Sequence, residues 1–191
     1  PSANKFGKTS PTKAEHVAKG FEKEQITILD GGQSEVGLES TVLEAMEENG
    51  KAILTIFRPG AITEDALVQA IKERGLEVEI RRRSSLASPG NIEHHYMPNI
   101  PLVIVNQEEP QLRQQMRDEI CKEFELDRNV RGAELKLDQS PKLAARSLYA
   151  RMRECSDSGA SFIYVLRKRA QSGGLWDAIW DRLQRASSRI Y

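Results

Sequence analysis

Residues 41–57, which read TVLEAMEENGKAILTIF, carry the clearest short-range structural signal in the chain. Asn49-Gly50 separates two β-prone runs, and this dipeptide favours a two-residue hairpin turn because both turn residues need a positive φ. We therefore predict a strand pair over about 41–47 and 51–57. Arg58-Pro59-Gly60 follows directly and ends the second strand, because proline and glycine interrupt regular structure.

The segments on either side of this hairpin predict further helices and strands. Downstream, Thr63 caps a helix, and the alternation of apolar and charged residues over 76–80 predicts a strand with one buried face. Upstream, Ser10-Pro11 predicts the start of a helix, with serine as N-cap and proline at the first helical position, that ends at Gly20. The alternating residues 25–29 predict a strand.

Residues 84–100 are rich in Ser, Pro, Gly and Asn and predict an interdomain linker. Beyond the linker, apolar runs alternate with helical stripes, and the expected strands and helices are strands at 102–105, 135–137 and 162–166 and helices at 112–124, 141–154 and 175–187. The first of these strands is apolar throughout, which is typical of a parallel strand covered on both faces. Three alternations of strand and helix predict a small Rossmann-like α/β unit with a parallel sheet over 101–191, after a first part over 1–83.

Composition excludes several classes of function. The 191 residues hold 28 Lys+Arg and 28 Asp+Glu, so net charge gives no general case for binding nucleic acid or a membrane surface. No apolar run approaches the roughly 20 residues of a membrane-spanning helix. The two cysteines, Cys121 and Cys155, form no C-x-x-C motif, and we expect a reduced, cytoplasmic protein. The chain opens without Met inside what resembles a working motif, so we expect a fragment of a longer protein.

The familiar catalytic motifs are absent: the sequence has no H-x-x-x-H, no P-loop, no strand-linked G-x-G-x-x-G and no G-x-S-x-G. What remains is a set of short polar patches on loops, namely Ser2-Ala3-Asn4, Ser10-Pro11-Thr12, Gly37 to Thr41, Arg58-Pro59-Gly60 and His94-His95-Tyr96. Hydroxyls, amides and a guanidinium placed in this way suit the binding of an anion or nucleotide. Each patch taken alone also has an ordinary reading as a helix cap, a strand start, a turn or a solvated surface charge.

In combination and in this order, these patches resemble the second half of the YrdC-like catalytic domain of threonylcarbamoyl-adenylate synthases. The resemblance also includes Ile28 to Gly32 and His95-Tyr96-Met97-Pro98. Residues 174–186, GLWDAIWDRLQRA, are similar to the end of the extra C-terminal domain in two-domain members of that family. The resemblance implies half of a twisted open-sheet α/β domain, a linker and a complete accessory domain.

What the resemblance implies is synthesis of threonylcarbamoyl-AMP from L-threonine, bicarbonate and ATP with Mg²⁺, releasing pyrophosphate. The product would pass to the machinery that transfers the threonylcarbamoyl group to tRNA. The implied site residues are Ser2 and Ser40 for threonine, Asn4 and Thr12 for ATP, Arg58 as the phosphate clamp, and His95 and Tyr96 as a lid over the nucleotide.

The sequence also departs from the family pattern. Asn91-Ile92-Glu93 stands where members commonly carry a Met-Lys-Tyr-Arg-like run, and a carboxylate there would repel phosphates. The family's first half, with its Lys-x-Arg motif, is not in this sequence, so we expect the fragment alone to be inactive. Two alternatives stay open at this point. One is a related carbamoyl-adenylate-forming domain of the kind found in hydrogenase maturation. The other is a non-catalytic RNA-binding module, for which the Arg-rich tripeptides 81–83 and 167–169 would supply weak contacts.

Overall fold

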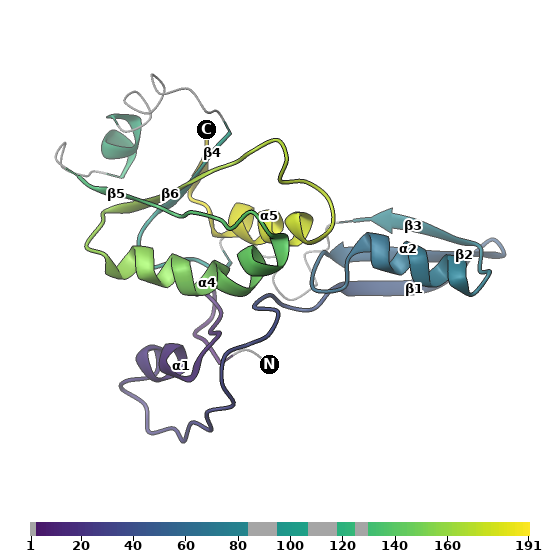
Figure 1. Ribbon diagram of the computed structural model, residues 1–191, viewed down its shortest axis with the longest axis horizontal. Helices are drawn as coiled ribbons and strands as arrows, with labels where there is room; N and C mark the ends of the chain where they lie inside the picture. Colours follow the sequence, from purple (N-terminus) through teal and green to yellow (C-terminus); the bar gives the residue numbers. More distant parts are fainter. Residues whose placement is uncertain (1–2, 84–94, 107–117, 125–129) are drawn as a thin grey trace.

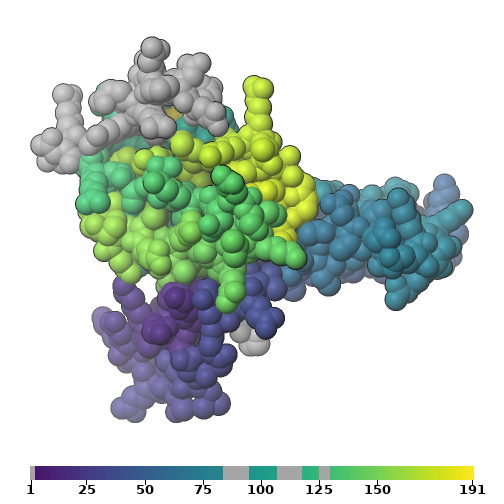
Figure 2. Space-filling view, in the orientation of Figure 1, coloured from purple at the N-terminus to yellow at the C-terminus, as the bar shows by residue number. Residues whose placement is uncertain are grey.

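The computed structural model describes residues 3–83, 95–106, 118–124 and 130–191. Its strands form two separate sheets, a three-stranded sheet in the order β1-β2-β3 and a four-stranded sheet in the order β5-β6-β4-β7. The three-stranded sheet projects as an arm from the larger α/β unit, and the N-terminal segment packs below that unit (Figures 1 and 2).

The arm begins with the predicted hairpin. β1 (Val42–Glu48) runs antiparallel to β2 (Lys51–Arg58), with Glu48 opposite Lys51. The two turn residues, Asn49 and Gly50, both have positive φ, 53° and 74°. This is the backbone that the Asn-Gly dipeptide favours, so the hairpin prediction is confirmed in turn and register.

After Pro59 and Gly60 the chain continues into α2 (Glu64–Glu73), which leads to β3 (Val78–Arg82), parallel to β2. The predicted cap is present, because the Thr63 hydroxyl accepts a hydrogen bond from the Ala66 amide at 3.3 Å. Such a bond satisfies one of the free amides at the helix start.

The four-stranded sheet is parallel throughout, as predicted. Its strands are β4 (Leu102–Val105), β5 (Gly132–Glu134), β6 (Phe162–Leu166) and the short β7 (Arg189–Ile190), which the sequence reading did not predict. All four residues of β4 are buried. Leu102 and Ile104 belong to one apolar cluster and Val103 and Val105 to another, so this strand is covered on both faces.

Helices account for the two clusters. α4 (Pro141–Asp157) and α5 (Leu175–Ala186) pack side by side on one face, contributing side chains such as Leu148 and Ile179 to its core. Residues 118–123 are helical and place Ile120 against the other face. Most of the predicted linker, residues 84–94, and the first part of the predicted helix, residues 112–117, lie outside the described residues.

Three predicted elements are wrong in detail. Residues 25–29 form no strand, because no described strand lies alongside to complete its hydrogen bonds. The first helix, α1 (Ala14–Gly20), begins after Lys13 rather than at Ser10-Pro11, whose hydroxyl is used elsewhere. The strand predicted at 135–137 lies three residues earlier, at β5. The apolar side chains that suggested it, such as Leu135, are buried just past the strand end.

Both cysteines, Cys121 and Cys155, are free thiols. Within the described ranges, no helix is long and apolar enough to cross a lipid bilayer.

Candidate functional site

Two glycines, Gly60 and Gly37, allow the loop over 37–41 to lie close to the end of β2 on one side and to α4 on the other. A Cβ on Gly60 would lie 2.3 Å from the Thr41 amide nitrogen and 2.6 Å from the Glu39 carbonyl oxygen. Gly37, with φ of 76°, would bring a Cβ to 2.6 Å from the backbone of Arg146 in α4. Only residues without a side chain allow these approaches, so the sequence itself fixes this loop against both neighbours.

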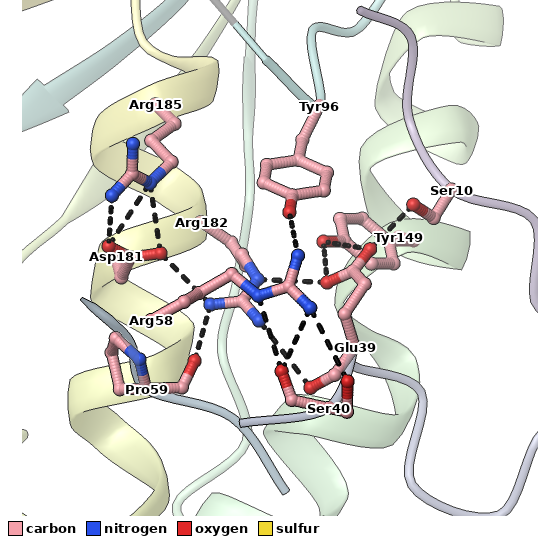
Figure 3. Close-up of polar contacts among 10 residues, drawn as sticks. All are labelled: Ser10, Glu39, Ser40, Arg58, Pro59, Tyr96, Tyr149, Asp181, Arg182 and Arg185. Carbon is pink, nitrogen blue, oxygen red and sulfur yellow. Dashed lines mark hydrogen bonds and ion pairs between the residues drawn. The ribbon is translucent and has the colours of Figure 1, made fainter. Parts of the chain in front are cut away.

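Arg58 lies at the end of β2 and is only 6% exposed. It points into the junction between the two units, which we define by the residues Glu39, Ser40, Arg58, Tyr96, Tyr149 and Arg182. Its Nε and Nη2 atoms donate to the Ser40 carbonyl oxygen at 3.2 and 2.9 Å, and Nη2 also lies 3.5 Å from the Ser40 hydroxyl. Its Nη1 atom donates to the Tyr96 hydroxyl at 3.4 Å (Figure 3). The ordinary reading of Arg58 as a solvated surface charge is therefore wrong, and three of the predicted site residues meet here.

Glu39, next to Ser40, is the acceptor at the centre of the junction. Its carboxylate accepts hydrogen bonds from the Ser10 hydroxyl at 2.6 Å, the Tyr149 hydroxyl at 2.9 and 3.0 Å, and Arg182 Nε at 2.8 Å. Burial alone would raise the pKa of Glu39, but the Arg182 charge and the hydrogen bonds from Arg182 and Ser10 outweigh it and lower that pKa. Glu39 is thus held as an anion.

Arg182 comes from α5 and has no solvent exposure. Besides Glu39, its Nη1 atom donates to the Pro59 carbonyl oxygen at 2.6 Å and to Asp181 at 2.9 Å. Arg185, one turn further along, pairs with the same aspartate at 3.0 Å. Counted formally, the guanidinium groups of Arg58, Arg182 and Arg185 carry one more charge than the carboxylates of Glu39 and Asp181.

Tyr96 closes the junction from the other side. It is 1% exposed, and its positive φ of 65° is unusual for a residue with a side chain. Its ring stacks on Tyr149 at 5.8 Å, and the Arg182 guanidinium lies 5.5 Å from its centroid. Burial raises the pKa of Tyr96, so its hydroxyl stays protonated. The neighbouring His95 ring packs edge-on against it at 4.1 Å, and burial lowers the pKa of His95.

Asn4 and Thr12 lie in a second group. Asn4 lines a pocket of about 380 Å³, together with Lys8, His16 and Arg153. Thr12 is buried and is not among the residues that line this pocket, but its amide donates to one of them, His16, at Nδ1 over 3.1 Å. Among the described residues, the hydrogen bonds do not join Asn4 or Thr12 directly to Arg58. The connection runs through the intervening chain over 8–10, where Thr9 donates to the Tyr96 carbonyl oxygen at 3.2 Å.

Within the described part of the chain, Asn4 Oδ1 and His95 Nδ1 are buried without a hydrogen-bond partner, as are Arg153 Nε, Trp180 Nε1 and the Tyr191 hydroxyl. Unpaired buried polar atoms are unusual and call for an explanation, and a bound ligand is one. Ser2 lies outside the described residues, so its predicted role stays a prediction.

The structure uses Ser10 in a way that the sequence reading did not predict. This residue was expected to cap the first helix, but its hydroxyl binds Glu39, and Lys13 occupies the N-cap position without a side-chain cap.

The arginines over 81–83 also differ from a free basic patch. Arg81 pairs with Glu48 and Glu79, and Arg82 pairs with Glu64 and Asp177.

Three residues of the junction were missed as functional candidates: Glu39, Tyr149 and Arg182. One signal was available. Arg182 lies four residues after Ala178 and three after Ile179, on the apolar stripe of α5, and a charged residue on such a stripe is rarely buried without a partner. Within the part of the chain that the structure describes, no group of three His, Cys, Asp or Glu side chains could hold a metal ion.

Fold and site together define a class of protein. A parallel-sheet α/β unit closes a buried, cationic polar site at the end of a hairpin strand that belongs to a second unit. The chain belongs to the family described as threonylcarbamoyl-AMP synthase, C-terminal domain, whose model matches residues 62–188. A second family model, described as telomere recombination, matches residues 1–60. The YrdC-like resemblance is confirmed, whereas the division at residues 84–100 stays a prediction.

Curated relatives agree with this assignment. A threonylcarbamoyl-AMP synthase of Pyrococcus abyssi is 28% identical over 198 residues, covering 98% of this chain and 56% of the relative. That of Bacillus subtilis is 40% identical over 108 residues, covering 54% of this chain and 29% of the relative. The chain thus spans about half the length, or less, of the curated relatives it matches.

Two solved structures match the whole chain. The crystal structure of P. abyssi Sua5 complexed with L-threonine has a TM-score of 0.73 at 27% identity, and the match covers 58% of that chain. A structure of the same protein, in which a histidine and the tyrosine after it are replaced by alanine, has a TM-score of 0.71 at 26% identity.

Proposed function

We propose that this chain is part of an L-threonylcarbamoyladenylate synthase that converts L-threonine, bicarbonate and ATP to threonylcarbamoyl-AMP and pyrophosphate. The observation that carries the proposal is the convergence of Ser40, Arg58 and Tyr96 from three separate segments at one junction, where Arg58 and Tyr96 are buried and Ser40 is exposed (Figure 3). The family assignment, the names of the relatives and the L-threonine complex of the Pyrococcus protein support it.

The residue types at the junction suit this reaction. A carbamate oxygen of carboxylated threonine attacks the α-phosphorus of ATP, a new P–O bond forms, and the bond to the β-phosphate bridging oxygen breaks as pyrophosphate leaves. The attacking oxygen is already anionic, so no strong general base is needed. The site must instead bring two anions together and offset their repulsion, which is a task for positioned donors and guanidinium groups.

Each residue would then have a definite task. Ser40 would contact the threonine portion, and Arg58 would clamp phosphate oxygens with a planar fork that lysine lacks. Asn4 and Thr12 would contact ATP from the neighbouring pocket, while His95 and Tyr96 would cover the nucleotide. The unpaired Asn4 Oδ1 and His95 Nδ1 atoms are in keeping with ligand contacts at these two positions.

Mg²⁺ would enter this scheme with the nucleotide. Among the described residues, no group of three His, Cys, Asp or Glu side chains could hold the ion. The product would be consumed by the machinery that transfers the threonylcarbamoyl group to tRNA. We further propose that the 191 residues alone are inactive, because the Lys-x-Arg motif of the family is not among them.

The test measures threonine-dependent pyrophosphate release by the intact parent protein with ATP, magnesium and bicarbonate. Replacement of Arg58 by alanine should lower the rate by about 10²-fold or more, because a buried charge clamp on the reacting phosphate is lost. Arg74→Ala is the matched control, since Arg74 lies at the exposed end of α2 and bonds only within its helix, to the Ala70 carbonyl oxygen, among the contacts described.

Release that does not depend on threonine would contradict the proposal. Salt-dependent RNA binding without nucleotide binding would then favour the RNA-binding module. Release by the isolated 191-residue chain would contradict the expected inactivity of the fragment.

A further inference from the structure

We propose that Arg182, from the C-terminal α/β unit, is a positioning residue of the substrate site: it sets the places of Ser40 and Arg58 without touching the substrate itself. This inference rests on the proposed function for the identity of the substrate. It assigns the C-terminal unit a direct part in building the site, in a position that its own sequence motifs do not announce.

The three nitrogen atoms of the Arg182 guanidinium contact two different loops. Nε binds the Glu39 carboxylate at 2.8 Å, Nη2 lies 3.4 Å from the Glu39 carbonyl oxygen, and Nη1 binds the Pro59 carbonyl oxygen at 2.6 Å. Glu39 directly precedes Ser40, and Pro59 directly follows Arg58. One planar group therefore binds two loops, each at a residue that is adjacent in sequence to a site residue (Figure 3).

Arg182 also contacts Tyr96, the third of the site residues. The Tyr149 ring lies 5.8 Å and the Arg182 guanidinium 5.5 Å from the centroid of the Tyr96 ring, so two side chains of the C-terminal unit contact it. The same guanidinium thus contacts a neighbour of Ser40, a neighbour of Arg58 and Tyr96 itself. No other side chain drawn in the close-up joins all three.

An arginine is an unusual residue at a buried position of α5. Arg182 has no solvent exposure, and a buried cation is costly unless its partners are well placed. A residue with only a packing task on this apolar stripe of α5 would be served by an apolar side chain of similar length. A guanidinium with donors to Glu39, Pro59 and Asp181 instead supplies directional contacts in several directions at once.

The experiment compares Arg182→Met and Arg182→Lys with a matched control, Arg151→Met, in the intact protein. Arg151 is an arginine of the same α/β unit, lies on α4, is partly buried, and bonds to Asp138 and to the Lys136 carbonyl oxygen rather than to the substrate loops. For each variant, kcat and KM for L-threonine are measured by pyrophosphate release. Amide hydrogen exchange is measured over 38–41 and 58–60.

We expect Arg182→Met to lose about 10²-fold in kcat/KM, the size of effect that a displacement of about 1 Å at a reacting group produces. Exchange over 38–41 and 58–60 should quicken. Arg182→Lys should recover little, because an ammonium cannot span both loops. Arg151→Met should stay near the native protein in both measurements.

A second variant separates positioning from folding. Arg182→Met leaves Glu39 buried without its counter-charge and can fail to fold for that reason alone. Arg182→Met combined with Glu39→Gln removes both charges and should restore thermal stability. If positioning is the task of Arg182, this double variant folds but keeps its lowered kcat/KM and fast loop exchange.

Native-like kinetics in the folded double variant, or unchanged loop exchange in Arg182→Met, would overturn the inference. Equal losses in Arg151→Met would also overturn it. Absence of threonine-dependent release in the native protein would instead count against the proposed function, and the exchange data would still decide whether Arg182 holds the two loops.

Discussion

The two sheets of the molecule differ in how their apolar residues are used. In the four-stranded sheet every residue of β4 is buried, and α4 and α5 cover one face with residues such as Leu148 at 0% exposure. In the three-stranded arm, Leu43 and Met46 of β1 remain 40% and 45% exposed. Hydrophobic burial is therefore concentrated in the C-terminal unit.

The difference shows what attaches the substrate loops to that unit. The contact is made by directional polar bonds, chiefly those of Glu39 and Arg182, together with the packing of Leu38 on the apolar core of that unit. Polar networks of this kind fix geometry well but depend on every member being satisfied. Stability and site geometry should therefore respond to different substitutions.

The largest expected effect on stability tests the apolar side of this comparison. Leu148→Ala should cost about 2–5 kcal/mol, because it opens a cavity in a packed core. The equivalent change on the arm, Leu43→Ala, should stay within about 0.5 kcal/mol. Urea unfolding followed by tryptophan fluorescence measures both, since Trp176 and Trp180 belong to the same cluster as Leu148. Equal costs at the two positions would remove the contrast between the sheets.

A smaller effect tests the polar junction through pH. The folded-state pKa of Glu39 is lowered, so its ionised form stabilises the fold above the ordinary value of 4.5, and this contribution is lost as pH falls through the folded-state pKa. Glu39→Gln removes that dependence. Between about pH 6 and about pH 3, the native protein should lose more stability than the variant.

Glu47→Gln, an exposed change on β1, provides the control and should follow the native pH curve. If Glu39→Gln also follows the native curve, the carboxylate does not join the two units as an anion.

Much of the fold could be predicted because its signals are local. The hairpin follows from Asn49-Gly50, whose backbone preference needs no distant partner. The run over 102–105 is apolar throughout, and this alone indicates a strand covered on both faces. Helix α4 begins at Pro141, where a proline at the first position is favoured.

The errors have a non-local cause. Residues 25–29 alternate like a strand, but a strand forms only beside a partner, and Leu29 is 92% exposed. β5 pairs at Gly132 to Glu134, residues with low strand propensity, because β6 presents free backbone groups there. Pairing partners of this kind cannot be read from a local pattern.

The candidate site was partly predictable for a similar reason. Ser40, Arg58 and Tyr96 were recognised by motif, and the structure brings them together. Arg182 and Tyr149 are more than 100 residues away from Glu39 in sequence, and only the folded chain reveals their contact. The charged position on the α5 stripe was the one local indication.

We expect Ser40 to contact the threonine substrate at the junction that it forms with Arg58 and Tyr96. Titration calorimetry of L-threonine with the intact protein tests it most directly, comparing the native protein with Ser40→Ala and with Ser34→Ala, an exposed serine in the preceding loop. We predict native-like binding for Ser34→Ala and about tenfold weaker binding for Ser40→Ala, the effect of one lost hydrogen bond. Equal affinity in Ser40→Ala and the native protein would contradict the account.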